Sequence, residues 1–159
     1  MLEPLREPSC FGRRATIVGT RKRDVLRGTQ HADVIVGRGG ADRIVGRRGR
    51  DIVCGGRAGD RILGSRGPDR LKGGRGRDIL VGGRGDDRLD GGRGDDRLGG
   101  GRGDDRLAGG RRRDRLRGNR GNDHLQGGAG RDRLRGGPGA DVLAGRPGRV
   151  QTNLALATG

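Results

Sequence analysis

One apolar position recurs every nine residues through most of the chain. From Gly19 to Ala144 the sequence divides into fourteen nonapeptides without insertion or deletion, and the eighth position of each is Leu, Ile or Val. The first position is always Gly and the sixth is always Asp. A fixed period of this kind predicts a repeat architecture in which each unit packs against its neighbours.

Each nonapeptide divides into a turn and a short strand. Positions one to six, such as GGRGDD at 82–87, are rich in glycine, which suits turns with positive φ and places where two chains approach closely. Positions seven to nine, such as RLD at 88–90, predict a strand whose middle residue points inward while its neighbours face water. A helix is excluded because each glycine would cost about 1 kcal/mol relative to alanine.

One apolar residue per nonapeptide cannot build a core alone, so two nonapeptides are expected to form one coil. The predicted fold is all-β: the coils stack into two short parallel sheets, with the eighth-position side chains packed between them. Thr16, Ile17 and Val18 look like the strand half of an earlier unit, whereas Val150 stands where the next Asp is expected. We therefore predict an N-terminal cap segment at 1–18, repeats at 19–144, and a degenerate repeat with a C-terminal cap or tail at 145–159, in which Leu154 and Leu156 would cap the last coil.

The composition alone would indicate a disordered chain. Hydrophobic residues make up 28% and aromatic residues 1%, and 39 of the 159 residues are glycine. This apolar surface is too small to offset the entropy lost on ordering so much glycine, so order must come from stacking, from a ligand or from both. The net charge of +16 indicates anionic partners such as nucleic acid, lipid or cell-wall polymers, or else a solvated basic surface.

The sixth-position aspartates are the candidate metal ligands, because two nonapeptides per coil place them in two rows, one along each edge. The first row is Asp24, Asp42, Asp60, Asp78, Asp96, Asp114 and Asp132, and the second is Asp33, Asp51, Asp69, Asp87, Asp105, Asp123 and Asp141. Adjacent coils lie about 4.7–4.9 Å apart, so these carboxylates would repel unless a cation lay between them. Calcium binds six to eight oxygens at about 2.3–2.6 Å and could bridge two coils, whereas magnesium prefers strict octahedral geometry and zinc prefers His or Cys.

Several units resemble a known repeat. GGRGRDILV at 73–81, GGRGDDRLD at 82–90 and GGPGADVLA at 136–144 match G-G-x-G-x-D-x-U-x, the hemolysin-type calcium-binding repeat of the RTX (repeats-in-toxin) family. CFGRRATIVGT at 10–20 and DIVCGG at 51–56 are similar to segments of short secreted bacterial RTX-like proteins.

The resemblance implies a parallel β-roll that binds several Ca²⁺ ions between coils, through sixth-position aspartates and turn carbonyls. Carried over to this chain, it assigns all fourteen aspartates as calcium ligands. The turn glycines assigned to supply carbonyls are Gly73, Gly74, Gly76, Gly82, Gly83, Gly85, Gly91, Gly92, Gly94, Gly100, Gly101 and Gly103. It also implies an extracellular protein, disordered at low calcium, that orders at about 0.1–1 mM calcium. No signal peptide is visible in this sequence.

The chain departs from this family in its arginines. Arg23, Arg50, Arg77, Arg113 and Arg131 stand at the fifth position beside the Asp and are expected to weaken calcium binding there. The unit at 109–117 lacks its fourth-position glycine, and those at 19–27 and 28–36 lack both accessory glycines, so these sites are also expected to be weak. Alternatively, guanidinium groups neutralise the aspartate rows and give a roll that needs no calcium.

Arginine also gives the expected surface its charge. Arg61, Arg70, Arg88, Arg97, Arg106, Arg115 and Arg133 stand at the seventh position, where stacking would form stripes able to bind anionic cell-surface polymers. Phe11 is the only aromatic residue, so sequence-specific nucleic-acid binding is not expected. Three RGD tripeptides, beginning at Arg84, Arg93 and Arg102, resemble integrin-recognition motifs but follow from the repeat itself.

The remaining chemistry is sparse. Cys10 and Cys54 are not in a zinc-binding spacing, and the sequence leaves open whether they form a disulfide or stay as two thiols. No nucleophile–base group or phosphate-binding loop is visible, so an enzyme is not expected. No apolar stretch is long enough to span a membrane.

Overall fold

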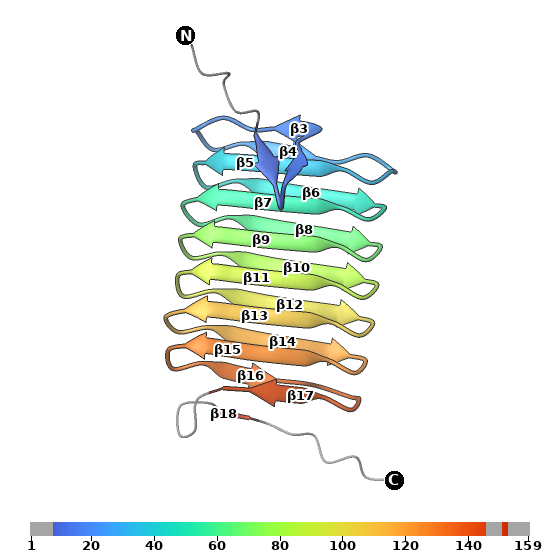
Figure 1. Cartoon of the computed structure of the whole chain (residues 1–159), viewed down its shortest axis with the longest axis vertical. Helices are drawn as coiled ribbons and strands as arrows, with labels where there is room; N and C mark the ends of the chain where they lie inside the picture. The colour runs from blue at the N-terminus through green and yellow to red at the C-terminus, as the bar shows by residue number, and fades with distance from the viewer. Residues whose placement is uncertain (1–7, 146–150, 153–159) are drawn as a thin grey trace.

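The structure, a computed structural model, describes residues 8–145 and the strand at 151–152. This part of the chain contains strands and no helix. It winds as a column of coils, each of which contributes one strand to each of two sheets (Figure 1). The predicted all-β, two-sheet architecture is therefore confirmed, while Val150 and the cap expected at Leu154–Leu156 lie outside the described residues.

The strands alternate between the two sheets along the chain. The sheet that we call the odd sheet contains β3 (Ile17–Val18), β5 (Val34–Gly39), β7 (Ile52–Arg57), β9 (Arg70–Arg75), β11 (Arg88–Arg93), β13 (Arg106–Arg111), β15 (His124–Ala129) and β17 (Val142–Ala144). The even sheet contains β4 (Val25–Arg27), β6 (Arg43–Arg48), β8 (Arg61–Arg66), β10 (Ile79–Arg84), β12 (Arg97–Arg102), β14 (Arg115–Arg120), β16 (Arg133–Arg135) and β18 (Gln151–Thr152). Neighbouring strands within each of these sheets are parallel, as predicted.

The register repeats the sequence period. Leu80 pairs with Leu98 in the even sheet, and Leu89 pairs with Leu107 in the odd sheet, so two nonapeptides make one coil. Most strands are longer than the three residues predicted, because they run from the seventh position of one unit through the third position of the next. In-phase stacking gives these extra residues parallel partners, as in the pairing of Arg84 with Arg102.

The eighth-position side chains form the core between the sheets. Twelve of them, from Ile35 to Leu134, make one continuous buried cluster, and Leu26 and Leu143 pack against its ends. Ile17 also packs there, and β3 pairs Ile17 with Ile35, which confirms that this segment is the strand half of an earlier unit. Each coil thus adds only two core side chains, and the core is a thin layer along the column.

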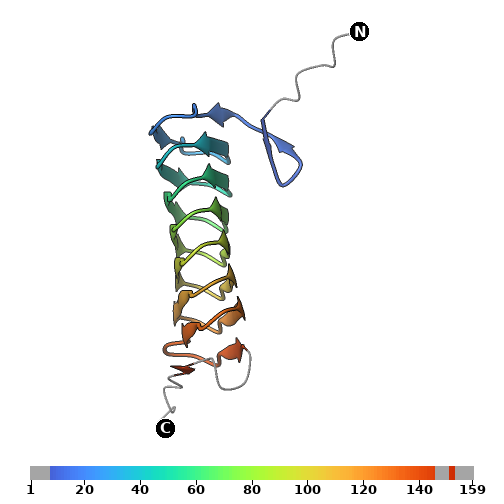
Figure 2. The ribbon, with the colours of Figure 1, turned by 90° about the vertical axis from the view of Figure 1, so that its left-hand side faces the viewer.

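The N-terminal segment forms a hairpin beside the first coils. Its antiparallel strands are β1 (Ser9–Cys10) and β2 (Arg13–Arg14). Figure 2 shows that the hairpin lies at the side of the column and does not cover its end. The hairpin carries the buried Cys10, whose sulfur bonds to Cys54 at 2.09 Å, so the structure pairs the two cysteines.

Beneath the hairpin lies a second, smaller core on the outer face of the odd sheet. Val34, Val36 and Ile52 are buried there with Cys10, although they occupy the seventh and ninth positions that were expected to face water. The expectation is wrong for these strands because the hairpin replaces solvent above β5 and β7. Beyond them Phe11 reaches β9, where its ring centroid lies 4.4 Å from the Arg70 guanidinium carbon.

Candidate metal-binding edges

The two aspartate rows lie along the two edges of the column. Each sixth-position Asp ends a turn and immediately precedes a strand, so its side chain returns toward the interior. Twelve of the fourteen carboxylates are buried, and only those in the terminal coils, Asp24 and Asp141, are partly exposed. The coil therefore brings the predicted residues together in two continuous rows.

A hydrogen-bond ladder joins the aspartates within each row. The backbone N–H of Asp69 donates to Oδ1 of Asp87 at 2.8 Å, and the N–H of Asp87 donates to Oδ1 of Asp105 at 2.8 Å. The same bond recurs from Asp24 to Asp132 along the first row and from Asp33 to Asp141 along the second, at 2.7–3.0 Å. The sequence predicted only repulsion between the carboxylates of a row, and did not reveal that they accept hydrogen bonds from the backbone N–H groups of aspartates in the adjacent coil.

The second carboxylate oxygen has a different environment. Oδ2 is buried without a hydrogen-bond donor in ten of these residues: Asp42, Asp51, Asp60, Asp69, Asp78, Asp87, Asp96, Asp105, Asp114 and Asp123. It packs against the first-position glycine of its own unit, where a Cβ atom would collide with it, as at Gly82 beside Asp87. A buried, unpaired carboxylate oxygen is costly unless a cation or a proton neutralises it.

The same burial shifts the acidity of these groups. Loss of solvent is the main cause that raises the pKa of Asp60, Asp69, Asp87, Asp105 and Asp114 to about 7, and of Asp51, Asp78 and Asp96 to about 6. The backbone N–H bond opposes the shift, and neighbouring carboxylates add to it. The rows therefore favour neutralisation by a bound positive charge.

In the first two units, the Oδ2 atom of the row aspartate accepts hydrogen bonds from a residue of the same unit. In each, the second-position threonine donates both its backbone N–H, at 2.6 Å, and its hydroxyl, at 3.0 Å, to Oδ2: Thr20 to Asp24 and Thr29 to Asp33. These are the units whose missing glycines predicted weak sites. The structure supplies a physical reason, since their carboxylates already have two donors.

Arginine does not neutralise the rows in the described part of the chain. The ion pairs between two described residues join Lys72 to Asp90 at 3.8 Å, and Arg77 and Arg113 to Asp95 at 3.9 and 3.6 Å. Asp90 and Asp95 stand at the ninth and fifth positions, outside the rows. Two of the fifth-position arginines thus pair with Asp95. Among the described residues, no ion pair joins an arginine to a row aspartate, so the alternative of rows neutralised by guanidinium groups is not supported.

The turns also hold a shorter outer ladder that the sequence did not reveal. The N–H of Asp104 donates to Oδ1 of Asp86 at 2.9 Å, and the N–H of Asn122 donates to Oδ1 of Asp104 at 2.8 Å. These fifth-position side chains are exposed. Asp95 likewise accepts from the N–H of Arg113 at 3.3 Å, so all three RGD aspartates already accept a backbone hydrogen bond, which is a structural role.

The assigned glycines divide by their position in the unit. Those at the first position, Gly73, Gly82, Gly91 and Gly100, are buried against the carboxylates. Those at the second and fourth positions, Gly74, Gly76, Gly83, Gly85, Gly92, Gly94, Gly101 and Gly103, all have positive φ. Only the fourth-position glycines lie in the turns that end at the aspartates, because the first- and second-position glycines belong to the preceding strands.

The donor set fits a cation that accepts backbone oxygen. No group of three or more His, Cys, Asp or Glu side chains converges within the described residues. A cation between two coils would therefore be held by Oδ2 of the row aspartates and by turn carbonyls. Such an all-oxygen set suits calcium and does not suit zinc.

These features define a repeat solenoid whose edges are lined with buried carboxylates. The sequence profile of the RTX calcium-binding nonapeptide repeat (four copies) matches residues 14–44, 27–62, 55–89, 73–107 and 108–143, which together cover most of the chain. The chain belongs to this family of calcium-binding, structural repeats. No curated protein matches the sequence. Within its described residues the chain has no helix of the length and hydrophobicity needed to cross a membrane.

Proposed function

We propose that the protein is a calcium-responsive β-roll, disordered at low calcium and ordered by calcium bound between successive coils along both edges. The ligands are the sixth-position aspartates and the turn carbonyls, and the strongest sites lie in the central units at 82–108. Bound calcium would neutralise pairs of carboxylates on adjacent coils. The observation that carries the proposal is the set of ten buried Oδ2 atoms without a donor.

The central units are favoured for local electrostatic reasons. Asp86, Asp95 and Asp104 each add a negative charge next to a row aspartate in this region. The units at 19–36 have threonine donors on Oδ2, and the unit at 109–117 has arginine at its third to fifth positions. Binding should therefore begin in the middle of the column and reach the first units last, or not at all.

A calcium titration followed by circular dichroism tests this function. We expect the β signal to appear at about 0.1–1 mM calcium, to be reversed by EGTA, and to respond much less to magnesium. Equilibrium dialysis would give the number of ions bound. A β signal that persists in EGTA would contradict calcium-dependent folding and favour a roll that is stable without calcium.

Two double variants distinguish calcium binding by the row aspartates from a general effect of negative charge. Asp87→Asn with Asp105→Asn alters two adjacent row carboxylates, whereas Asp86→Asn with Asp104→Asn removes the same charge from the exposed residues beside them. We expect the first pair to raise the calcium midpoint several-fold and the second to shift it much less. Equal shifts would indicate a general charge effect and would count against the assigned ligands.

We further propose that the protein works outside the cell. The disulfide between Cys10 and Cys54 supports an oxidising compartment, and calcium at the required concentration is typical of extracellular modules. In protein recovered from the source organism, alkylation should give a mass shift only after reduction. Two thiols that alkylate without reductant would contradict the extracellular location.

A further inference from the structure

The outer face of the even sheet is a continuous arginine surface. Its strands carry one arginine in β4, three in β6, two in β8, one in β10, two in β12, three in β14 and two in β16, and none of these seven strands contains Asp, Glu or Lys. The odd sheet has fewer arginines and contains Asp90 in β11, and the N-terminal hairpin covers part of it. The two faces therefore differ in charge and in accessibility.

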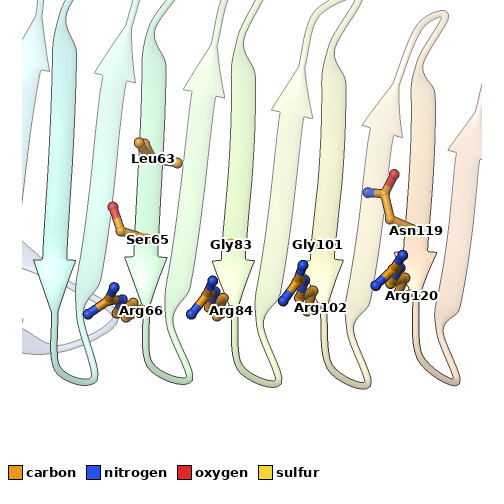
Figure 3. Close-up of a pocket in the computed structure, with 9 residues that line it drawn as sticks. All are labelled: Leu63, Ser65, Arg66, Gly83, Arg84, Gly101, Arg102, Asn119 and Arg120. Atoms are coloured by element: carbon orange, nitrogen blue, oxygen red, sulfur yellow. The ribbon is translucent and has the colours of Figure 1, made fainter.

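The third-position arginines of the even sheet form a straight column. Arg48, Arg66, Arg84, Arg102 and Arg120 pair in register at the ends of five successive strands. One guanidinium is thus presented per coil, about every 4.7–4.9 Å along the column axis. All five side chains are exposed, and Figure 3 shows four of them in a row at the strand ends.

A groove runs beside this arginine column. It is lined by Leu63, Ser65, Gly83, Gly101 and Asn119 together with the arginines Arg66, Arg84, Arg102 and Arg120 (Figure 3). Because two of the floor residues are glycines, the surface there is low and the arginines stand above one side of it. The groove crosses four strands at right angles, so its occupant would be an extended chain parallel to the column axis.

The column arginines have no carboxylate partner among the described residues. The ion pairs that join two described residues belong to Lys72, Arg77 and Arg113, none of which lies in the column. The nearest carboxylates along the chain, Asp86 and Asp104, lie in the turns after Arg84 and Arg102, and each accepts a backbone hydrogen bond through Oδ1. The five aligned guanidinium groups therefore form no ion pair with a described carboxylate.

We propose that this groove binds a single, unbranched phosphodiester chain. Guanidinium groups pair with phosphate through two parallel hydrogen bonds, and the surface contains arginine to the exclusion of lysine. A straight column matches an extended strand better than a duplex, whose phosphates rise about 3.4 Å per nucleotide along the helix axis and wind away from a flat face. The groove has no aromatic side chain, so it contacts the phosphates without stacking the bases.

Binding of synthetic oligonucleotides to the calcium-saturated full-length protein tests this proposal. The probes are an abasic oligodeoxynucleotide, an oligothymidylate of the same length, and a duplex of that length, each followed by fluorescence anisotropy. We expect the two single strands to bind equally well and the duplex to bind more weakly. Stronger binding of oligothymidylate than of the abasic strand, or of the duplex than of either, would overturn the proposal.

Two quadruple variants locate the site. In the first, Arg66, Arg84, Arg102 and Arg120 are each changed to Gln; in the second, the odd-sheet counterparts Arg57, Arg75, Arg93 and Arg111 are changed in the same way. Both sets stand at the third position of four successive coils and remove the same charge. Circular dichroism with calcium would verify that both variants fold before binding is compared.

The salt dependence distinguishes a built site from general attraction. We expect the even-sheet variant to bind the abasic strand about ten-fold or more weakly, and its plot of log affinity against log salt to become shallower by about 3, as loss of four phosphate contacts on a single strand predicts. The odd-sheet variant should change both quantities much less. Equal losses in the two variants would show that net charge alone holds the strand, and would overturn the assignment of the groove.

Discussion

Two residues at the fourth position of their repeats adopt a backbone conformation that suits glycine better. Ala58 and Arg112 occupy the fourth position, where most units have glycine, and their φ angles are 76° and 87°. A non-glycine residue in this region costs about 1–2 kcal/mol, part of which is offset by the greater unfolded-state entropy of glycine. We expect Ala58→Gly and Arg112→Gly each to stabilise the calcium-bound roll by about 0.5–1 kcal/mol in urea denaturation.

A matched alanine provides the control for this prediction. Ala41 is exposed, as Ala58 is, but it stands at the fifth position and is not among the residues with positive φ. Ala41→Gly should therefore destabilise the roll by about 0.5–1 kcal/mol, the usual cost of glycine entropy. If Ala58→Gly and Ala41→Gly changed the free energy of unfolding in the same direction, backbone strain in the turn would not be the cause.

The first-position glycines are required for a different reason. A Cβ atom at Gly82 would collide with the Asp87 carboxylate and with the carbonyl of Gly100, whereas one at Gly99 would meet only the Asn119 side chain at 3.8 Å. We expect Gly82→Ala to destabilise the roll by about 1–3 kcal/mol, as overpacking does, and to weaken calcium binding. Gly99→Ala should leave both the unfolding midpoint and the calcium midpoint nearly unchanged, and a comparable loss there would contradict the steric explanation.

The residues of the candidate site were predictable, but their partners were not. A sixth-position Asp in every unit identified both rows, because the period alone decides which side chains share an edge. The N–H of Asp69 on Oδ1 of Asp87 joins residues in different coils, and it depends on stacking distances that a sequence pattern does not contain. The Thr29 hydroxyl on Asp33 is local and was recognisable in principle, since threonine replaces glycine at that position.

Among the elements, the N-terminal hairpin is the one that the repeat pattern failed to place. Its signal was present in Val34, Val36 and Ile52, which are apolar at outward positions on neighbouring strands of one sheet. An apolar patch of this kind on a sheet face calls for a covering segment. Residues 8–14 lie outside the repeat, so its period does not predict where they pack. The contact of the hairpin with β5 and β7 is therefore visible only in the structure.

Reduction of the disulfide should loosen the hairpin and the first coils selectively. The bond links residues 44 apart in sequence, and loss of such a cross-link typically costs about 2–4 kcal/mol. Each coil contacts only its neighbours, so hydrogen exchange after reduction should increase in β3, β5 and β7 and remain slow in β11 and β13. A double variant with Cys10→Ala and Cys54→Ala should reproduce this pattern, and uniform acceleration along the column would contradict it.

For the whole molecule, the unbroken frame made the architecture predictable. Fourteen units without an insertion leave the stacked coil as the arrangement that packs the eighth-position side chains between two sheets, and the structure confirms it. The division into 1–18, 19–144 and 145–159 stays a prediction, and so does the assignment of calcium to all fourteen aspartates. Composition alone would indicate a disordered chain because it does not show where the charges lie. In the structure the arginines lie on the outer faces, while the aspartate rows are buried.

The buried rows give the whole roll a pH dependence whose sign changes with calcium. Without calcium, Asp69 and Asp87 have pKa values of about 7 in the fold, against about 3.9 in an unfolded chain. The folded state then holds more protons between about pH 4 and pH 7, so its stability is greatest below that range and is lost as the pH rises through it. Acidification of a calcium-free sample should therefore increase the β signal.

With calcium the same acidification should have the opposite effect. Protons compete with the metal for the carboxylates, so the calcium midpoint should rise as the pH falls from about 7.5 to 5.5. Circular dichroism across this range, in metal-stripped buffer and in saturating calcium, would compare the two slopes directly. Asp87→Asn combined with Asp105→Asn should make both pH slopes shallower. The same change at the exposed Asp86 and Asp104 should have a smaller effect. Parallel slopes in the two buffers would mean that the row carboxylates do not bind calcium, because only a shared site makes the proton and the metal exclude one another.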